Sequence, residues 1–273
     1  TISTDIEIKE IIMKQPKPVA VFDSGLGGIS VLQELIRLMP QENYLYFGDS
    51  LNAPYGIKST DEVLALTLKN IDFLLSRQAK AIVLACNTAT SAAVTVLREK
   101  YHQIPIIGME PALKPAINKL HGRIVVMATE VTLREQKFAT LLDRYRAEAE
   151  IISLPASGIV NFVEQGITQG PELEAYLNEI MAPFHTPKVS GIVLGCTHFP
   201  FVKDSITKAL GYEVEFFDGA EGTAKETQRQ LHNNGLETDS TQPGNITFFN
   251  SNDNPKILSL CQQLLNSKKQ QVL

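Results

Sequence analysis

Two short stretches of the sequence, far apart in the chain, have nearly the same pattern. Residues 81–88 read Ala-Ile-Val-Leu-Ala-Cys-Asn-Thr, and residues 191–198 read Gly-Ile-Val-Leu-Gly-Cys-Thr-His. In each, an apolar run typical of a buried strand ends in a small residue, then a cysteine and polar residues. The cysteines, Cys86 and Cys196, are 110 residues apart, about the size of one small domain. The repeat predicts two similar lobes, each with a cysteine at a strand end.

Strand and helix patterns alternate along the chain. We expect strands at 19–22, 44–47, 81–85, 104–107, 123–127, 151–154, 191–194 and 214–217. We expect helices at 29–38, 91–101 and 133–145 and from Pro171 onward. A further helix is expected after Ser59, which can cap it with Glu62 as the capping-box partner. This alternation predicts the α/β class, with mainly parallel sheets flanked by helices. Ligand sites in such sheets lie at the carboxyl ends of strands, so we expect an active site in the cleft between the lobes.

The length of the chain suits this two-lobed arrangement. It has 273 residues, of which 44% are hydrophobic, enough to bury a sizeable core. We expect residues 14–110 together with 219–273 to form the first α/β lobe, and residues 111–218 to form the second.

Composition restricts the partners. The formal net charge is −5 and there is no long Lys/Arg cluster, so we expect no nucleic-acid partner. No run approaches the roughly 18 apolar residues that span a bilayer, and residues 1–12 lack the layout of a signal peptide. Three cysteines are a poor disulfide framework and fit a reducing compartment. We therefore expect a cytoplasmic protein without a membrane partner. Met13 is a second candidate for the natural start.

Each cysteine has a structural and a chemical interpretation. A free cysteine is most often a small buried hydrophobe, and Cys261, within an apolar helical pattern, is expected to be one. Cys86 and Cys196 occupy matched positions at strand ends, which packing alone does not explain, and a thiolate there acts as nucleophile, base or metal ligand. Zinc is an alternative, with Cys86, Cys196 and His198 as three ligands, but a fourth ligand at the usual spacing is missing.

A glycine-rich segment, Asp23-Ser24-Gly25-Leu26-Gly27-Gly28, follows the first expected strand and opens a helix. Exposed amides there would cradle an anion, although the segment is neither a Walker A motif nor GxGxxG. The alternative is a tight turn with Asp23 or Ser24 as a helix cap. Taken alone, Glu164 is typical of a solvated carboxylate at a helix end, and His198 of a side chain that bonds a loop carbonyl.

Four motifs occur together and in order: Asp23-Ser24-Gly-x-Gly-Gly, Pro54-Tyr55-Gly56, Ala85-Cys86-Asn87-Thr88-Ala89 and Gly195-Cys196-Thr197-His198. In this order and spacing the chain resembles the cofactor-independent aspartate/glutamate racemase family, and its bacterial glutamate racemases in particular. The similarity extends from about Pro18 to the last helix. His198 after Cys-Thr resembles the glutamate enzymes, whereas aspartate racemases tend to carry Glu there.

The resemblance implies roles for individual residues. Cys86 and Cys196 would be the two acid/base residues, with Asp23 supporting Cys86 and His198 supporting Cys196, and Glu164 would be a further acidic helper. A second set would hold the substrate, to which Asp23 and His198 also contribute: Ser24, Pro54, Tyr55, Gly56, Asn87, Thr88, Thr129 and Thr197. Thr132 pairs with Thr129 after the first strand of the second lobe, but the surrounding sequence departs from the family's glycine-rich form.

The chemistry agrees with the repeat. Racemisation removes the α-proton from one face and returns a proton to the other, which two similar half-sites can do without turning the substrate over. The resemblance implies glutamate as the small-molecule substrate, D-glutamate supplied for peptidoglycan, and neither cofactor nor metal; a homodimer is left open. The alternatives are a racemase for aspartate or another acidic amino acid, a non-catalytic two-lobed amino-acid binder, and a zinc hydrolase.

Overall fold

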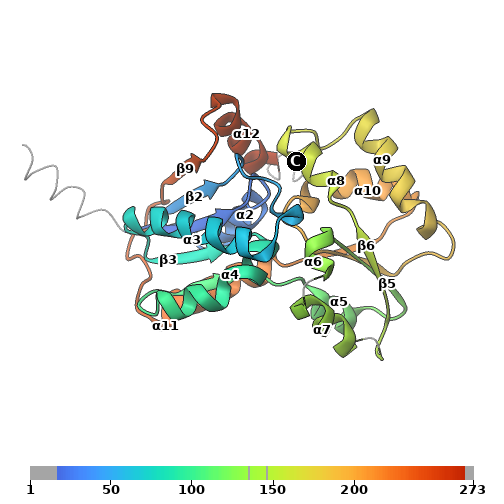
Figure 1. The fold of residues 1–273 in the computed structure, drawn as a ribbon, viewed down its shortest axis with the longest axis horizontal. Coiled ribbons are helices and arrows are strands. Elements are labelled where there is room, and N and C mark those ends of the chain that lie inside the picture. Colours follow the sequence, from blue (N-terminus) through green and yellow to red (C-terminus); the bar gives the residue numbers. More distant parts are fainter. Residues whose placement is uncertain (1–16, 135, 146, 268–273) are drawn as a thin grey trace, which may run out of the picture.

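The computed structural model describes residues 17–134, 136–145 and 147–267, which form two parallel sheets in two lobes that lie side by side (Figure 1). The five-stranded sheet has the order β4-β3-β1-β2-β9. Its strands are β1 (Val19–Asp23), β2 (Tyr44–Gly48), β3 (Ala81–Leu84), β4 (Ile106–Gly108) and β9 (Ile246–Asn250). The four-stranded sheet has the order β6-β5-β7-β8. Its strands are β5 (Arg123–Ala128), β6 (Glu150–Pro155), β7 (Gly191–Leu194) and β8 (Glu215–Asp218).

Strand β1 shows why both faces of the first sheet are covered. Val19 and Val21 point into one apolar cluster, and Ala20 and Phe22 point into another, because side chains alternate between the faces of a strand. Helices cover both faces of the sheet. The helices on one face are α3 (Thr60–Ser76) and α4 (Asn87–Lys100), and on the other α2 (Ile29–Leu38), α11 (Ala220–Asn233) and α12 (Pro255–Asn266).

The second sheet is covered in the same way. Ile124 and Val126 of β5 pack with one set of helices, and Val125 and Met127 pack with the other. The first set is α5 (Leu113–Lys119) and α7 (Gln136–Tyr145), and the second is α8 (Gly158–Glu164), α9 (Pro171–Met181) and α10 (Lys203–Leu210). The short helix α6 (Glu130–Arg134) follows β5.

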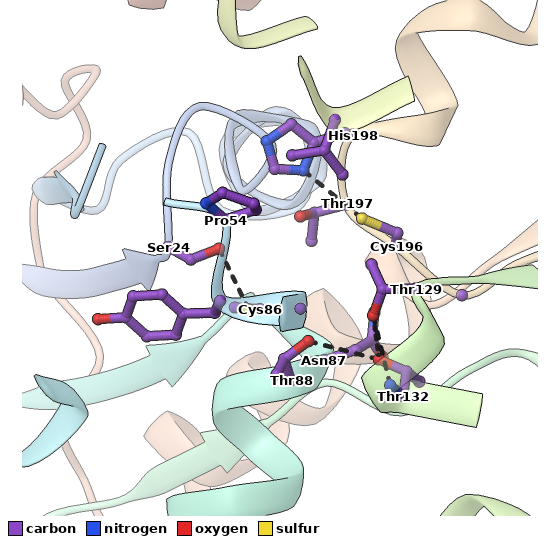
Figure 2. A pocket seen from close by; sticks show the side chains of 14 residues that line it. Ser24, Pro54, Cys86, Asn87, Thr88, Thr129, Thr132, Cys196, Thr197 and His198 are labelled. Carbon is purple, nitrogen blue, oxygen red and sulfur yellow. Dashed lines mark hydrogen bonds between the residues drawn. The ribbon is translucent and has the colours of Figure 1, made fainter. Parts of the chain in front are cut away.

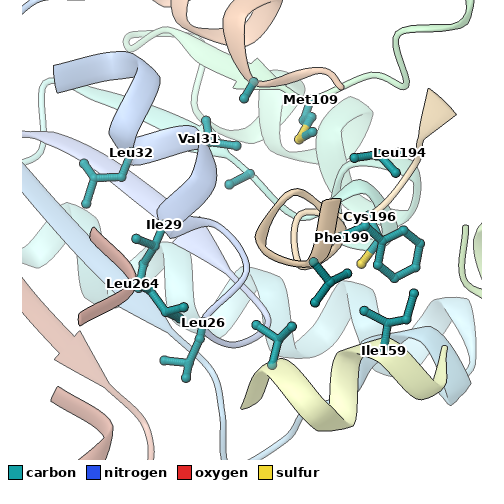
Figure 3. Packing of buried hydrophobic residues seen from close by; sticks show 14 of the residues in the cluster. Leu26, Ile29, Val31, Leu32, Met109, Ile159, Leu194, Cys196, Phe199 and Leu264 are labelled. Atoms are coloured by element: carbon teal, nitrogen blue, oxygen red, sulfur yellow. The ribbon is translucent and has the colours of Figure 1, made fainter. Parts of the chain in front are cut away.

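One apolar cluster continues from the first lobe into the second. It contains Leu26 and Ile29 from the first lobe and Ile159, Cys196 and Phe199 from the second (Figure 3). Apolar packing therefore joins the lobes beneath the cleft, and the polar site described below lies at the edge of this shared core.

The α/β class and the two-lobed arrangement are confirmed, and most expected elements lie within one or two residues of their predicted bounds. The Ser59–Glu62 capping box, Pro171 in the first turn of α9 and the buried position of Cys261 are also confirmed. The lobe limits remain a proposal; it is supported by the pairing of β9 with β2 and the packing of α11 on α2. The question of a start at Met13 lies outside the described residues.

Two expectations need correction, and one strand was missed. Helix α4 begins at Asn87 and not at residue 91, because Cys86 is its N-cap and the Cys86 sulfur accepts a hydrogen bond from the Ala89 amide. The expected helix 133–145 corresponds to the end of α6 and to α7. Strand β9 was not predicted from the sequence. Among the described residues, no helix combines the length and apolar character needed to cross a bilayer.

Candidate active site

The two cysteines of the repeat line one pocket between the lobes (Figure 2). Cys86 comes two residues after the end of β3, and Cys196 comes two residues after the end of β7. In each sheet, successive strands are added first on one side of a central strand and then on the other, and the cysteine lies where this direction changes. The central strand is β1, between β3 and β2, in the first sheet and β5, between β7 and β6, in the second. Such points at the carboxyl ends of parallel strands are the usual ligand sites of α/β sheets. Both thiols are free and buried.

His198 connects Cys196 to a carboxylate. Its Nδ1 lies 3.5 Å from Cys196 Sγ, and its Nε2 lies 2.6 Å from Glu164 Oε1. Burial lowers the pKa of His198, but its hydrogen bonds with Cys196 and Glu164 outweigh burial and raise this pKa well above its usual value. An imidazolium beside the sulfur stabilises a thiolate, so this half-site is equipped to accept a proton from carbon.

Cys86 is in a different electrostatic environment. Burial raises the pKa of its thiol to about 12, and the negative charge of Asp23 adds to this rise. The Cys86 sulfur lies 3.4 Å from Ser24 Oγ and accepts from the Ala89 amide, and these two hydrogen bonds lower the pKa of Cys86 in part. At neutral pH Cys86 is therefore a thiol, which can donate a proton.

Asp23, at the carboxyl end of β1, is fully buried and joins the two half-sites. Its Oδ1 accepts from the Gly25 amide at 2.9 Å, and its Oδ2 accepts from Thr197 Oγ at 3.0 Å. Burial raises the pKa of Asp23, and the nearby His198 opposes the rise. Asp23 thus acts on Cys86 through its charge, while one of its hydrogen bonds reaches the opposite lobe.

The expected substrate-binding residues line the same pocket as the cysteines. They are Ser24, Pro54, Tyr55, Gly56, Asn87, Thr88, Thr129, Thr197 and His198. Asp23, also expected there, is fully buried. The side-chain amide of Asn87 is buried, and neither its oxygen nor its nitrogen has a hydrogen-bond partner in the structure. A buried amide without partners is costly, so it indicates a place where a polar ligand binds.

The Pro54-Tyr55-Gly56 segment is held by a buried carboxylate. Tyr55 donates its hydroxyl to Asp49 Oδ2 over 2.6 Å, and the Asn70 amide donates to the same oxygen over 2.9 Å. Asp49 is 1% exposed. These bonds fix the short 3-10 helix Tyr55–Ile57 at the pocket wall.

The glycine-rich turn packs closely against side chains of the opposite lobe. A side chain at Gly25 would collide with the Glu164 carboxylate, and one at Gly27 would collide with Thr197 and His198. The Leu26 amide donates to Glu164 Oε1 over 2.6 Å, so a carboxylate of the chain itself occupies this amide. The expectation of exposed amides is therefore wrong for Gly25 and Leu26, which donate to Asp23 and Glu164. The expected side-chain cap is also wrong, since Gly28 is the N-cap and has no side-chain hydrogen bond.

The isolated interpretations of Glu164 and His198 are also wrong, since each side chain is mostly buried and they bond to one another. Thr132, which had no assigned role, lines the pocket and lies 3.0 Å from Thr129 and 3.4 Å from Thr88, hydroxyl oxygen to hydroxyl oxygen. Sequence reasoning missed Val160 and Gly195 as lining residues. The position of Val160, one helical turn before Glu164 on α8, was the available signal.

The zinc alternative gains no support from geometry. Within residues 17–134, 136–145 and 147–267, no group of three or more His, Cys, Asp and Glu side chains is arranged to hold a metal ion. The arrangement is instead two sulfurs, one of them beside an imidazole, next to hydroxyl and amide groups suited to carboxylates.

Comparison with known proteins decides the family. A sequence model described as Asp/Glu/Hydantoin racemase matches residues 26–227. The chain belongs to this racemase family. It is therefore a racemase, an enzyme of the isomerase class.

Relatives match over nearly their whole length. A glutamate racemase of Clostridium perfringens is 50% identical over 253 residues, which cover 92% of this chain and 97% of the relative. A glutamate racemase of Clostridium botulinum is 47% identical over 255 residues, which cover 93% and 99%.

Solved structures agree with the fold. Glutamate racemase from Francisella tularensis, in complex with D-glutamate, has a TM-score of 0.79 at 29% identity and covers 92% of this chain and 94% of its own. The Escherichia coli enzyme, in complex with L-glutamate and the activator UDP-MurNAc-Ala, has a TM-score of 0.80 at 28% identity, with coverage of 94% and 95%.

Proposed function

We propose that the chain is a glutamate racemase that interconverts L- and D-glutamate with two cysteines as acid and base. The observation that carries this proposal is the pair of free thiols, one from each lobe, in a single pocket. The names of the relatives and the glutamate bound in two similar structures support the choice of substrate.

In the proposed reaction, the Cys196 thiolate, which the His198 imidazolium stabilises before the step, removes the α-proton from one enantiomer and becomes a thiol. The electron pair of the broken C–H bond stays on the α-carbon, next to the carboxylate. The Cys86 thiol then donates its proton to the opposite face of the α-carbon and becomes a thiolate. For the other enantiomer the cysteines exchange roles, so each must be able to carry the proton.

The substrate's carboxylates and ammonium would be held by the hydroxyl and amide groups of the pocket, with Asn87 the clearest candidate because its amide lacks a partner. Donors arranged around the α-carboxylate stabilise the carbanion as its charge develops, and burial between the lobes strengthens their effect.

The proposal includes the cellular role and the surroundings of the enzyme. The product D-glutamate would serve peptidoglycan synthesis in the cytoplasm, and the protein would work as a monomer or homodimer without a cofactor. Dialysis against a chelator and treatment with a carbonyl scavenger should then leave the rate unchanged. Loss of activity that a metal or pyridoxal phosphate restores would contradict this part of the proposal.

Circular dichroism provides the direct test of the activity. Pure L- and D-glutamate should each lose optical activity in the presence of the enzyme, whereas L- and D-aspartate should react far more slowly. Faster racemisation of aspartate would favour the alternative substrate, and no change with either amino acid would favour a binding protein.

Two variants and an isotope experiment test the mechanism. Cys86→Ala and Cys196→Ala should each abolish racemisation in a folded protein. In heavy water, early product should carry deuterium at the α-carbon while recovered substrate stays largely undeuterated, because a different thiol donates on each face. Early product rich in protium, from either enantiomer, would refute the two-cysteine mechanism.

A further inference from the structure

The carboxylate of Glu164 is held from both lobes. On its own lobe, Oε1 lies 2.6 Å from His198 Nε2. From the opposite lobe, the Leu26 amide donates to the same Oε1 over 2.6 Å, and Ser50 Oγ donates to Oε2 over 3.2 Å. The two oxygens therefore have different partners: Oε1 bonds to the imidazole, and Oε2 bonds to Ser50.

Ser50 is itself oriented by its neighbours. It follows the end of β2, and the Asn250 amide at the end of the adjacent strand β9 donates to Ser50 Oγ over 3.0 Å. Since one lone pair of the Ser50 oxygen accepts this bond, its hydrogen is free to point at Glu164. A continuous series of hydrogen bonds thus runs from Asn250 through Ser50, Glu164 and His198 to the Cys196 sulfur.

Ser50 does not line the pocket that holds the cysteines. Its contact is with the Glu164 carboxylate, which is 18% exposed and packs directly against Gly25. Without the Ser50 hydroxyl, Oε2 would lose this donor, and the carboxylate would be free to turn away from the imidazole toward solvent.

We propose that Ser50 is a positioning residue for the Cys196 half-site, which it completes from the opposite lobe by holding Glu164 against His198. This inference rests on the proposed glutamate racemase function. It implies that the base on one face of the substrate is fully assembled only when the lobes meet, whereas the direct hydrogen-bond partners of Cys86, Ser24 and Ala89, lie in the first lobe.

The test compares Ser50→Ala with the wild-type enzyme, using Ser251→Ala as the matched control. Ser251 anchors the same loop, since its hydroxyl accepts from the Leu51 amide at 3.0 Å. We expect Ser50→Ala to lower kcat/KM by about tenfold, the order expected for one hydrogen bond to a charged group. Ser251→Ala should stay within about twofold of the wild type. Ser50→Thr, which keeps the hydroxyl, should retain most activity. Ser50→Val, whose side chain has nearly the shape of threonine but no hydroxyl, should not.

Two further measurements distinguish positioning from general loosening of the loop. The alkaline limb of the pH profile should move to lower pH in Ser50→Ala, because a displaced Glu164 no longer supports the imidazolium of His198. With α-deuterated substrate, the isotope effect on kcat/KM should rise in the direction in which Cys196 removes the proton and fall in the other, because only the Cys196 step is slowed.

Several outcomes would overturn the inference. One is a Ser50→Ala enzyme with wild-type rates, pH profile and isotope effects. Another is an equal loss in Ser251→Ala, which would assign the effect to loop anchoring. If Ser50→Ala does not fold, equal activities of Ser50→Thr and Ser50→Val decide against it. Failure of the wild-type enzyme to racemise glutamate would instead refute the proposed function, so the two failures are distinguishable.

Discussion

Cys86 should behave as a very weak acid when no substrate is added, and Asp23→Asn is the substitution that tests the cause. Burial is the main cause of the raised Cys86 pKa, and the Asp23 charge is the next. The variant keeps the shape of the side chain and removes its charge. We expect the Cys86 pKa to fall in the variant, while the contribution from burial remains.

The size of the effect in the wild-type enzyme follows from the structure. A rise from 9.0 to about 12 makes the thiolate less favourable by about 4 kcal/mol, at about 1.4 kcal/mol per pKa unit. At about pH 8, roughly one Cys86 side chain in 10,000 would be ionised, against about one in ten for an ordinary thiol with a pKa of 9.0.

Alkylation by iodoacetamide, followed by peptide mass spectrometry, measures this ionisation because only the thiolate reacts. The pH dependence is the useful quantity, since burial slows the reagent equally at every pH. In the wild-type enzyme the logarithm of the Cys86 rate should rise linearly with pH, without a plateau, as far as the protein stays folded. In Asp23→Asn the rate at a given pH should be higher.

A plateau in the wild-type rate near pH 9 would refute the reasoning, because it would mean that Cys86 ionises as a free thiol does. If the rate profile is unchanged in Asp23→Asn, burial can still explain the raised Cys86 pKa, but the charge of Asp23 cannot be one of its causes. Thiolate absorbance of the wild type minus that of Cys86→Ala provides an independent measurement.

Three further predictions concern the framework of the site. Cys261→Ala should keep most activity and lose about 1–2 kcal/mol of unfolding free energy in urea, since Cys261 is fully buried in the core; loss of racemisation in a folded variant would contradict this. Lys80→Met should lower the free energy of unfolding by about 3–5 kcal/mol, because Glu42, whose carboxylate lies 2.6 Å from the Lys80 ammonium, would stay buried without its charge partner. The double variant Lys80→Met/Glu42→Gln should recover part of this loss, and a double variant as unstable as the single one would argue against the charge explanation. Tyr55→Phe should raise KM more than it lowers kcat, because it frees the pocket wall from Asp49; steady-state kinetics with an unchanged KM would show that this bond does not position substrate.

The position of each half-site could be predicted because its signal is local. An apolar run, a small residue and a cysteine identify a strand end within eight residues, and the same pattern recurs at 191–198. The Ser59 capping box and Pro171 were predictable for the same reason, since each depends on residues a few positions apart. Strand β9 was not, because it is a half-exposed edge strand whose partner β2 lies some 200 residues earlier in the chain.

The sequence by itself determined which residues carry the chemistry: the two cysteines, their neighbours in the motifs and the parallel sheets that bring strand ends to one edge. Only the tertiary structure decided how these residues differ. Thr197 reaches Asp23 across 174 residues and Ser50 reaches Glu164 across 114, and no local pattern encodes such pairs. The physical reason is that a thiol's pKa depends on the burial and charges around the sulfur in three dimensions. Two nearly identical sequence stretches therefore fold into one half-site with an imidazolium beside the sulfur and another in which burial keeps the thiol protonated.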